Sequence, residues 1–171
     1  MNINSPGFKR LAYSLEIIVL FAIQQTPGLL PQIGGERPVT MIPVLLTIAM
    51  FEGQKSGMFF GLAIGLLMDF GYGKVLGFNA IILMLFGYIV GSLAINLIKN
   101  NILTVMLMSV FMVILFFTLH FLFFYILRGY DNGLYAFVEH YVPRIFYTIV
   151  VTPIIYFFNM AFTVKSSVEQ E

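Results

Sequence analysis

Apolar runs of about twenty residues recur along the whole length of this chain of 171 residues. A run of that length is what a helix needs to cross the hydrocarbon core of a bilayer. Hydrophobic residues make up 60% of the chain and charged residues only 10%, whereas a soluble domain carries about 25% charged residues. The sequence therefore predicts an all-α integral membrane protein that forms a single polytopic domain over residues 1–171.

The breaks between the apolar runs predict about six transmembrane helices. Pro27 is expected to end or kink the first of them, and Pro153 to interrupt the last. Residues 1–9 are expected to form a polar lead and residues 163–171 a polar tail. The expected spans are residues 11–30, 39–51, 56–70, 78–98, 102–127 and 143–162.

The second expected span is short for a crossing, which leaves three arrangements open: a tilt, a kink at Pro43 or a local thinning of the bilayer. Residues 52–55 predict a tight polar turn that makes spans two and three a helical hairpin. One long broken helix is the alternative. The polar loop 128–142 is expected to hold a short interfacial helix at residues 134–138.

An even number of spans places both ends of the chain on the same side of the membrane. Lys and Arg are slightly more frequent in the loops on that side, which predicts that both termini, with the lead and the tail, are cytoplasmic. The residues on that side are Lys9, Arg10, Lys55, Lys99 and Lys165, against Arg37, Lys74, Arg128 and Arg144 on the other.

The composition excludes several classes of function. The chain has no cysteine, which excludes disulfides, thiol catalysis and cysteine-based metal sites. Its net charge of +1 gives no electrostatic support for binding nucleic acid. Paired carboxylates, a His-Glu-x-x-His motif, clustered metal ligands and a phosphate-binding loop are all missing from the sequence. We therefore expect no catalytic residue, no metal and no cofactor.

Glycine recurs every fourth residue along the third expected span. On a helix this spacing makes a slowly winding groove without side chains, which lets another helix approach closely. Two interpretations are open: a docking groove for the helix of another protein, or close packing inside this chain. Gly87 and Gly91 form a second spaced pair in the fourth span. The first series comprises Gly53, Gly57, Gly61 and Gly65 and ends on Asp69.

Ionisable residues inside membrane spans are functional candidates because burying them is costly. Glu16 is expected to reach water or to pair with Lys9 or Arg10. Asp69 is expected to fix the glycine loop that follows it, by accepting backbone hydrogen bonds or by pairing with Lys74. That role is favoured over proton transfer.

Two further ionisable residues lie in the last two spans, His120 in the middle of span five and Arg144 at the start of span six. His120 stands in a Phe-rich helix and is expected to be a hydrogen-bonded packing residue, with a proton-relay or ligand role as the alternative. Arg144, with Glu139 and His140 nearby, is expected to form an interfacial ion pair or to contact a lipid headgroup.

The glycine series and the residues after it resemble the signature of the MreD family, the rod-shape-determining membrane proteins of bacteria. The stretch reads Gly57-x-x-x-Gly61-x-x-x-Gly65-Leu-Leu-Met-Asp69-x-x-x-Gly73-x-x-x-Gly77-x-Asn79-Ala80 and continues to Gly87-Tyr88-x-x-Gly91. Chain length, the number of spans and a proline in the last span agree with the family. Span six departs from it, because no Asn stands between Tyr147 and Pro153.

The resemblance implies a non-enzymatic role in the bacterial cytoplasmic membrane, in the control of cell shape and peptidoglycan synthesis. It implies contact with membrane lipid and with MreC, a protein with a single membrane helix. Through MreC it implies indirect association with RodA, the elongation penicillin-binding protein and MreB. The MreC helix is expected to dock at Gly57, Gly61, Gly65, Gly87 and Gly91. The loop between spans three and four is expected to be held by Asp69, Gly73, Gly77 and Asn79.

A second family of similar size is the alternative. The substrate-binding S-components of energy-coupling-factor transporters also have six spans, and we expect this chain to share their compact fold. A chain with their function would capture a vitamin, and the loop 128–142 would close over it. The polar and aromatic residues of that loop are Tyr130, Asp131, Asn132, Tyr135 and Tyr141.

Overall fold

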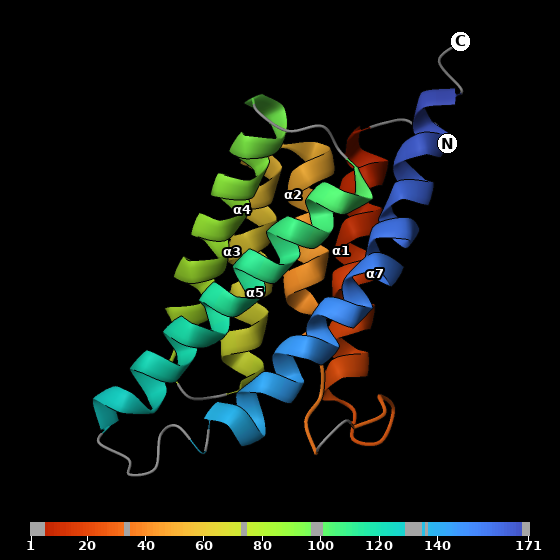
Figure 1. The fold of residues 1–171 in the computed structure, drawn as a ribbon. Helices are drawn as coiled ribbons and strands as arrows, with labels where there is room; N and C mark the ends of the chain where they lie inside the picture. Colours follow the sequence, from red (N-terminus) through yellow and green to blue (C-terminus); the bar gives the residue numbers. More distant parts are fainter. Residues whose placement is uncertain are drawn as a thin grey trace.

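The chain folds into a helical bundle, which confirms the all-α class. The computed structural model describes residues 6–32, 35–72, 75–96, 101–128, 135 and 137–168. Two of the helices, α5 and α7, cross diagonally over one face of the others (Figure 1). The elements are α1 (Pro6–Gln25), α2 (Met41–Glu52), α3 (Gln54–Tyr72), α4 (Phe78–Asn96), α5 (Ile102–Phe124), the 3-10 turn η1 (Ile126–Arg128), the π-helical turn η2 (Phe137–Tyr141) and α7 (Val142–Val168).

The short helix α2 is the centre of the bundle. Its ten residues from Met41 to Met50 are all buried, and α3, α4, α5 and α7 pack around it. At 1.5 Å per residue α2 is about 18 Å long, less than the ~30 Å of a bilayer core. Because protein surrounds this helix, it does not need the length of a lipid-facing span. Pro43 lies in its first turn, where the missing N–H breaks no helical hydrogen bond, so the kink considered at Pro43 has no physical cause.

A single residue joins α2 to α3. Gly53 has φ +84°, a left-handed conformation that favours glycine, and its N–H donates to the carbonyl of Ala49 at 2.9 Å. The two helices pack against each other. The predicted hairpin is therefore confirmed, with a tighter turn than residues 52–55, and one long broken helix is wrong.

The last helix is longer than predicted. Pro153 removes one backbone donor, yet α7 continues through it as one helix from Val142 to Val168, so the predicted interruption is wrong. A membrane helix tolerates a proline where its neighbours cover the freed carbonyl. The predicted polar tail is thus helical as far as Val168, and the predicted lead is helical from Pro6 onward.

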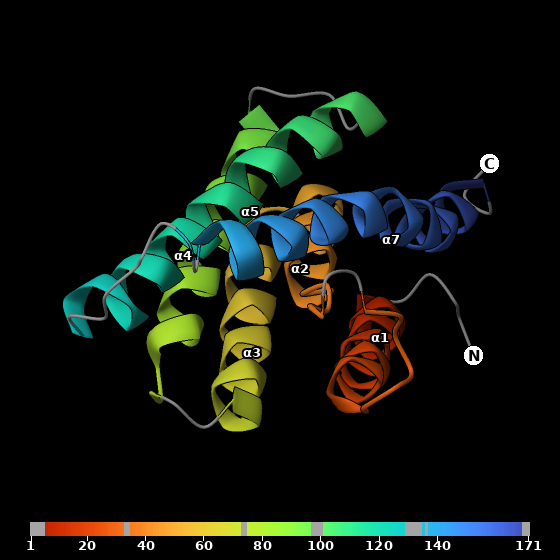
Figure 2. The same cartoon turned by 60° about the horizontal axis from the view of Figure 1, so that its bottom comes forward.

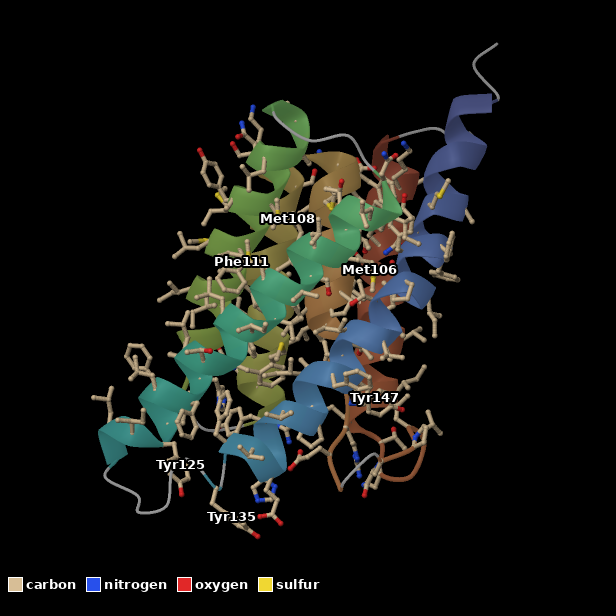
Figure 3. All side chains as sticks on the ribbon, in the orientation of Figure 1. Met106, Met108, Phe111, Tyr125, Tyr135 and Tyr147 are labelled. Carbon is tan, nitrogen blue, oxygen red and sulfur yellow. The ribbon has the colours of Figure 1, made fainter. Side chains whose placement is uncertain are left out.

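The loop before α7 is only partly covered by the described residues. Tyr135 is helical, and η2 runs from Phe137 directly into α7, so the short helix expected at residues 134–138 stays a prediction. Residues 129–134 and 136 lie outside the described residues. Tyr125 and Tyr135 lie at the same end of the molecule (Figure 3), where Tyr side chains suit a membrane–water interface.

Within the described residues, three helical segments are long and apolar enough to cross a membrane: Phe78–Ile95, Ile102–Phe124 and Phe137–Ala161. Helix α1 has 20 residues and α3 has 19, but charged residues lower the mean hydropathy of both helices, and glycines lower that of α3 further. The chain is therefore a multi-pass membrane protein, and the crossing of all six helices stays a prediction.

Seen from one end, α5 and α7 form a layer over the other helices, and α1 lies at the edge of the bundle (Figure 2). The start of α1 and the end of α7 lie at the same end of the molecule (Figure 1). The α2–α3 turn lies at that end too, while the α1–α2 and α3–α4 connections lie at the opposite end. This end with the termini carries Lys9, Arg10 and Lys55.

Candidate partner-binding site

The glycines of α3 and α4 face each other along a closed seam. A Cβ atom on Gly61 would lie 2.8 Å from the carbonyl carbon of Leu83, and one on Gly65 would lie 2.6 Å from the backbone nitrogen of Ala80. Backbone atoms cannot yield to a side chain at such distances, so only glycine fits. As residue numbers rise along α3, the numbers of the facing residues on α4 fall, as expected for antiparallel helices. The facing pairs are Gly57–Gly87, Gly61–Leu83 and Gly65–Ala80.

This seam leaves no room for another protein. The prediction that a partner helix docks on the five glycines is wrong, because α4 already fills the groove of α3. Gly87 and Gly91 belong to the opposite wall of the same seam, and a Cβ on Gly91 would lie 2.5 Å from the backbone nitrogen of Gln54. The alternative, close packing inside the chain, is confirmed.

Asp69 lies one turn beyond the last glycine of the seam and caps the start of α4. Its Oδ2 accepts hydrogen bonds from the N–H groups of Gly77 at 2.8 Å and Ala80 at 3.2 Å. Its Oδ1 accepts from the N–H of Asn79 at 3.1 Å and from the Asn79 side chain at 2.9 Å. A negative charge at a helix N-terminus is also favoured by the helix dipole.

The cap gives the predicted loop-fixing role a definite geometry. Asp69 is 1% exposed, which removes it from water, and its donors come from the end of the α3–α4 connection and the first turn of α4. Gly77 has φ +95°, the left-handed conformation in which glycine turns the chain into α4. Gly73 and Lys74 lie outside the described residues.

Glu36 ties the loop after α1 to the start of α7. Its carboxylate forms an ion pair with Arg144, and its Oε1 lies 3.1 Å from Nδ1 of His140. The predicted ion pair of Arg144 is therefore confirmed, with Glu36 as its partner. Glu139 instead lies beside Tyr135, and the hydrogen bond and negative charge of Glu139 raise the pKa of that phenol.

His120 is a packing residue, as predicted. Its Nδ1 lies 3.4 Å from the hydroxyl of Tyr141. Its ring lies among aromatic rings of α4 and α5, with centroids 4.5 Å from Phe124 and 6.2 Å from Phe78.

A row of polar residues on α7 was not predicted. Thr148, Thr152 and Asn159 are fully buried and lie on one face of the helix, since they are four and seven residues apart. This spacing in the sequence could have predicted a buried polar face on the helix. Each residue hydrogen-bonds a polar group of a neighbouring segment. The contacts are Val39 N–H to Thr148 Oγ1 at 3.0 Å, Ser109 Oγ with Thr152 Oγ1 at 2.8 Å and Asn159 Nδ2 to Thr47 Oγ1 at 2.7 Å.

A groove of about 530 Å³ lies between α1 and α7. Its walls are almost entirely apolar. Leu15, from α1, is 61% exposed and Ile154, from α7, is 67% exposed. Unlike the glycine seam, this surface is not filled by another part of the described chain.

Glu16 lies in the wall of the groove and is 8% exposed. It accepts a side-chain hydrogen bond from Asn159, while its Oε1 has no partner among the described residues. Lys9 lies 3.9 Å from Glu52 Oε1 instead. The predicted pairing of Glu16 with Lys9 or Arg10 is therefore wrong. Gln24, two turns further along the same face, is also buried and accepts two hydrogen bonds from Thr40.

Within the described ranges, no three His, Asp or Glu side chains come close enough together to hold a metal ion. The buried polar groups instead join helices to one another.

The comparison with known proteins agrees with this picture of a structural membrane protein. The family model described as rod shape-determining protein MreD matches residues 9–165. That match spans the bundle from the first turn of α1 to the last turn of α7. No curated protein and no solved structure matches the sequence. The chain belongs to the MreD family of non-enzymatic, rod-shape-determining membrane proteins.

Proposed function

We propose that this protein is a membrane scaffold of the bacterial cell-elongation machinery and that it binds the single membrane helix of MreC. The observation that carries the proposal is the open apolar groove between α1 and α7, in a chain of the MreD family. Through MreC the scaffold associates with RodA, the elongation penicillin-binding protein and MreB.

The shape of the α1–α7 groove suits a helix. Its lining on α1 runs from Phe8 to Leu20, which is about 18 Å at 1.5 Å per residue. It is thus elongated along the helix axis and covers more than half of the ~30 Å hydrocarbon core. Helices associate in lipid through close van der Waals packing and interhelical hydrogen bonds, and this groove offers both an apolar trough and the Glu16 carboxylate.

We place both termini in the cytoplasm. The support is the slight excess of Lys and Arg on that side, with Lys9, Arg10, Lys55, Lys99 and Lys165 against Arg37, Lys74, Arg128 and Arg144. An excess of Lys and Arg favours the cytoplasmic side. On this topology residues 1–9 and 163–171 are the cytoplasmic lead and tail of one membrane domain.

Vitamin capture, with a fold like that of the S-components, has no specific observation in its favour. A pocket lined by Asn79, Phe117, His120 and Arg144 among others has a volume of about 60 Å³. Sites for small molecules usually have ~300–1,000 Å³.

Affinity purification from native membranes in mild detergent, followed by mass spectrometry of proteins and small molecules, tests the proposal. We expect MreC to be recovered with the tagged protein. Recovery of a bound vitamin together with ATPase-linked subunits, and no MreC, would replace the scaffold with a transport function.

A further inference from the structure

The carboxylate of Glu16 is an unusual component for the wall of an apolar groove. It is the one acidic side chain among the residues that line the α1–α7 groove. It is more than nine-tenths buried, and Oε1 has no hydrogen-bond partner among the described residues. A buried acceptor without a donor is costly, and in lipid no water is present to satisfy it.

The buried contacts of Glu16 hold it in place. Asn159 of α7 donates to the carboxylate, and the Asn159 amide also donates to Thr47 at 2.7 Å. Thr47 is itself fully buried in α2. This row of hydrogen bonds links α1 through α7 to the core of the bundle, so that the carboxylate is presented to the groove in a defined position.

The depth of Glu16 limits what can reach it. It lies seven residues beyond Lys9 and six beyond Arg10, so that about 9–10 Å of helix separate it from the charged start of α1. A lipid headgroup beside these charges does not reach that depth, and an acyl chain has no hydrogen-bond donor. A membrane helix with a polar side chain at the same depth does satisfy both requirements.

We infer that Glu16 selects the helix that docks between α1 and α7 by accepting a hydrogen bond from a donor side chain of that helix at the depth of Glu16. Because this rests on the proposed docking of MreC, the partner is the MreC membrane helix. A fully apolar helix would leave Oε1 unpaired in lipid, so the carboxylate favours a donor-bearing helix over the other single-span helices of the membrane.

The test compares two substitutions at one position. Purified protein and fluorescently labelled MreC of the same organism are titrated in the same detergent. Glu16→Leu removes the acceptor and is expected to weaken binding about tenfold. Glu16→Gln keeps an acceptor: binding within about threefold of the original assigns a neutral donor, and a loss as large as that of Glu16→Leu assigns a cationic one. Unchanged binding by Glu16→Leu would overturn the inference.

A double-mutant cycle separates recognition from folding. Each polar residue in the MreC helix is replaced by Leu and titrated against the original protein and against Glu16→Leu. We expect one MreC substitution whose effect disappears in the Glu16→Leu background. If none of them couples to Glu16, the inference is wrong even where Glu16→Leu alone lowers affinity through instability.

A third variant distinguishes failure of this inference from failure of the proposed docking. Ala12→Phe fills the groove and keeps the Glu16 carboxylate, which lies one turn away on the same helix. If Ala12→Phe abolishes MreC binding while Glu16→Leu leaves it unchanged, docking in the groove is supported and selection by Glu16 is wrong. If neither variant changes binding, the docking site itself is wrong, and selection by Glu16 falls with it.

Discussion

At the scale of single residues, the four-residue repeat of glycine that ends on Asp69 serves one contact, the packing of α3 against α4. Asp69 continues the four-residue spacing of the glycines, and it lies where the α3–α4 seam ends and α4 begins. The glycines bring two backbones together, and the carboxylate then satisfies the N–H groups that the first turn of α4 leaves without partners.

Asp69→Asn is expected to destabilise the protein. The amide that replaces one oxygen cannot accept from the N–H groups facing it, so at least one buried donor is left unsatisfied, at a cost of about 2 kcal/mol. For a chain of this size that lowers the Tm by roughly 4–8 °C. The measurement is a thermal unfolding scan in detergent, with the exposed Glu139→Gln as the control. An unchanged Tm for Asp69→Asn would remove the capping role.

Gly61→Leu is expected to prevent the correct packing of α3 on α4. The new side chain would meet the backbone of Leu83, and overpacking against atoms that cannot move costs about 3 kcal/mol or more. Size-exclusion chromatography and a thermal scan measure the effect. Gly7→Leu is the matched control, because nothing lies within 4 Å of a Cβ at Gly7. A folded Gly61→Leu protein with normal stability would contradict the seam.

At the scale of whole helices, the sequence predicted the spacing but not the surfaces that meet. A four-residue glycine repeat predicts close approach of some helix, yet it carries no information on whether that helix belongs to the same chain. The burial of α2 depended on packing by α3, α4, α5 and α7, which periodicity within α2 does not reveal. The polar row from Thr148 to Asn159 could be seen in the spacing, whereas its partners lie 43 to 112 residues away in the chain.

The groove between α1 and α7 predicts a contrast between two alanines of the same helix. Ala12 lines the groove, whereas Ala22 is exposed outside it. Ala12→Phe is expected to lower recovery of MreC at least tenfold because the added ring occupies the trough. Ala22→Phe is expected to leave recovery unchanged. Quantitative co-purification measures both, with the Tm of each variant as a check on folding. Equal recovery with both variants would place the contact elsewhere.

At the scale of the whole molecule, the fold resolves into a tightly packed centre with α1 at its edge. Two hydrogen bonds hold α1 against α2. Gln24 of α1 accepts from the N–H of Thr40, just before α2, and Tyr13 of α1 donates to Glu52 at the end of α2. Between these two hydrogen bonds the outer side of α1 is open toward α7. The apolar groove on this side of α1 is the surface at which we propose that the partner docks.

The orientation of the molecule can be tested directly, because the chain has no natural cysteine. Lys55→Cys lies at the end that carries the termini, and Gln32→Cys lies at the opposite end. With both termini in the cytoplasm, a membrane-impermeant maleimide added to intact cells with a permeable outer envelope labels Gln32→Cys only. Labelling of Lys55→Cys alone would mean that the molecule is inverted.

Photo-crosslinking in living cells tests the docking of MreC most directly. A photoreactive amino acid is placed at Leu15, in the groove, and in a second strain at Leu107, which is exposed on α5 and does not line the groove. We predict a crosslinked product with MreC from position 15 and none from position 107. A product from position 107 with none from position 15 would contradict the proposed site and move the partner to another face of the bundle.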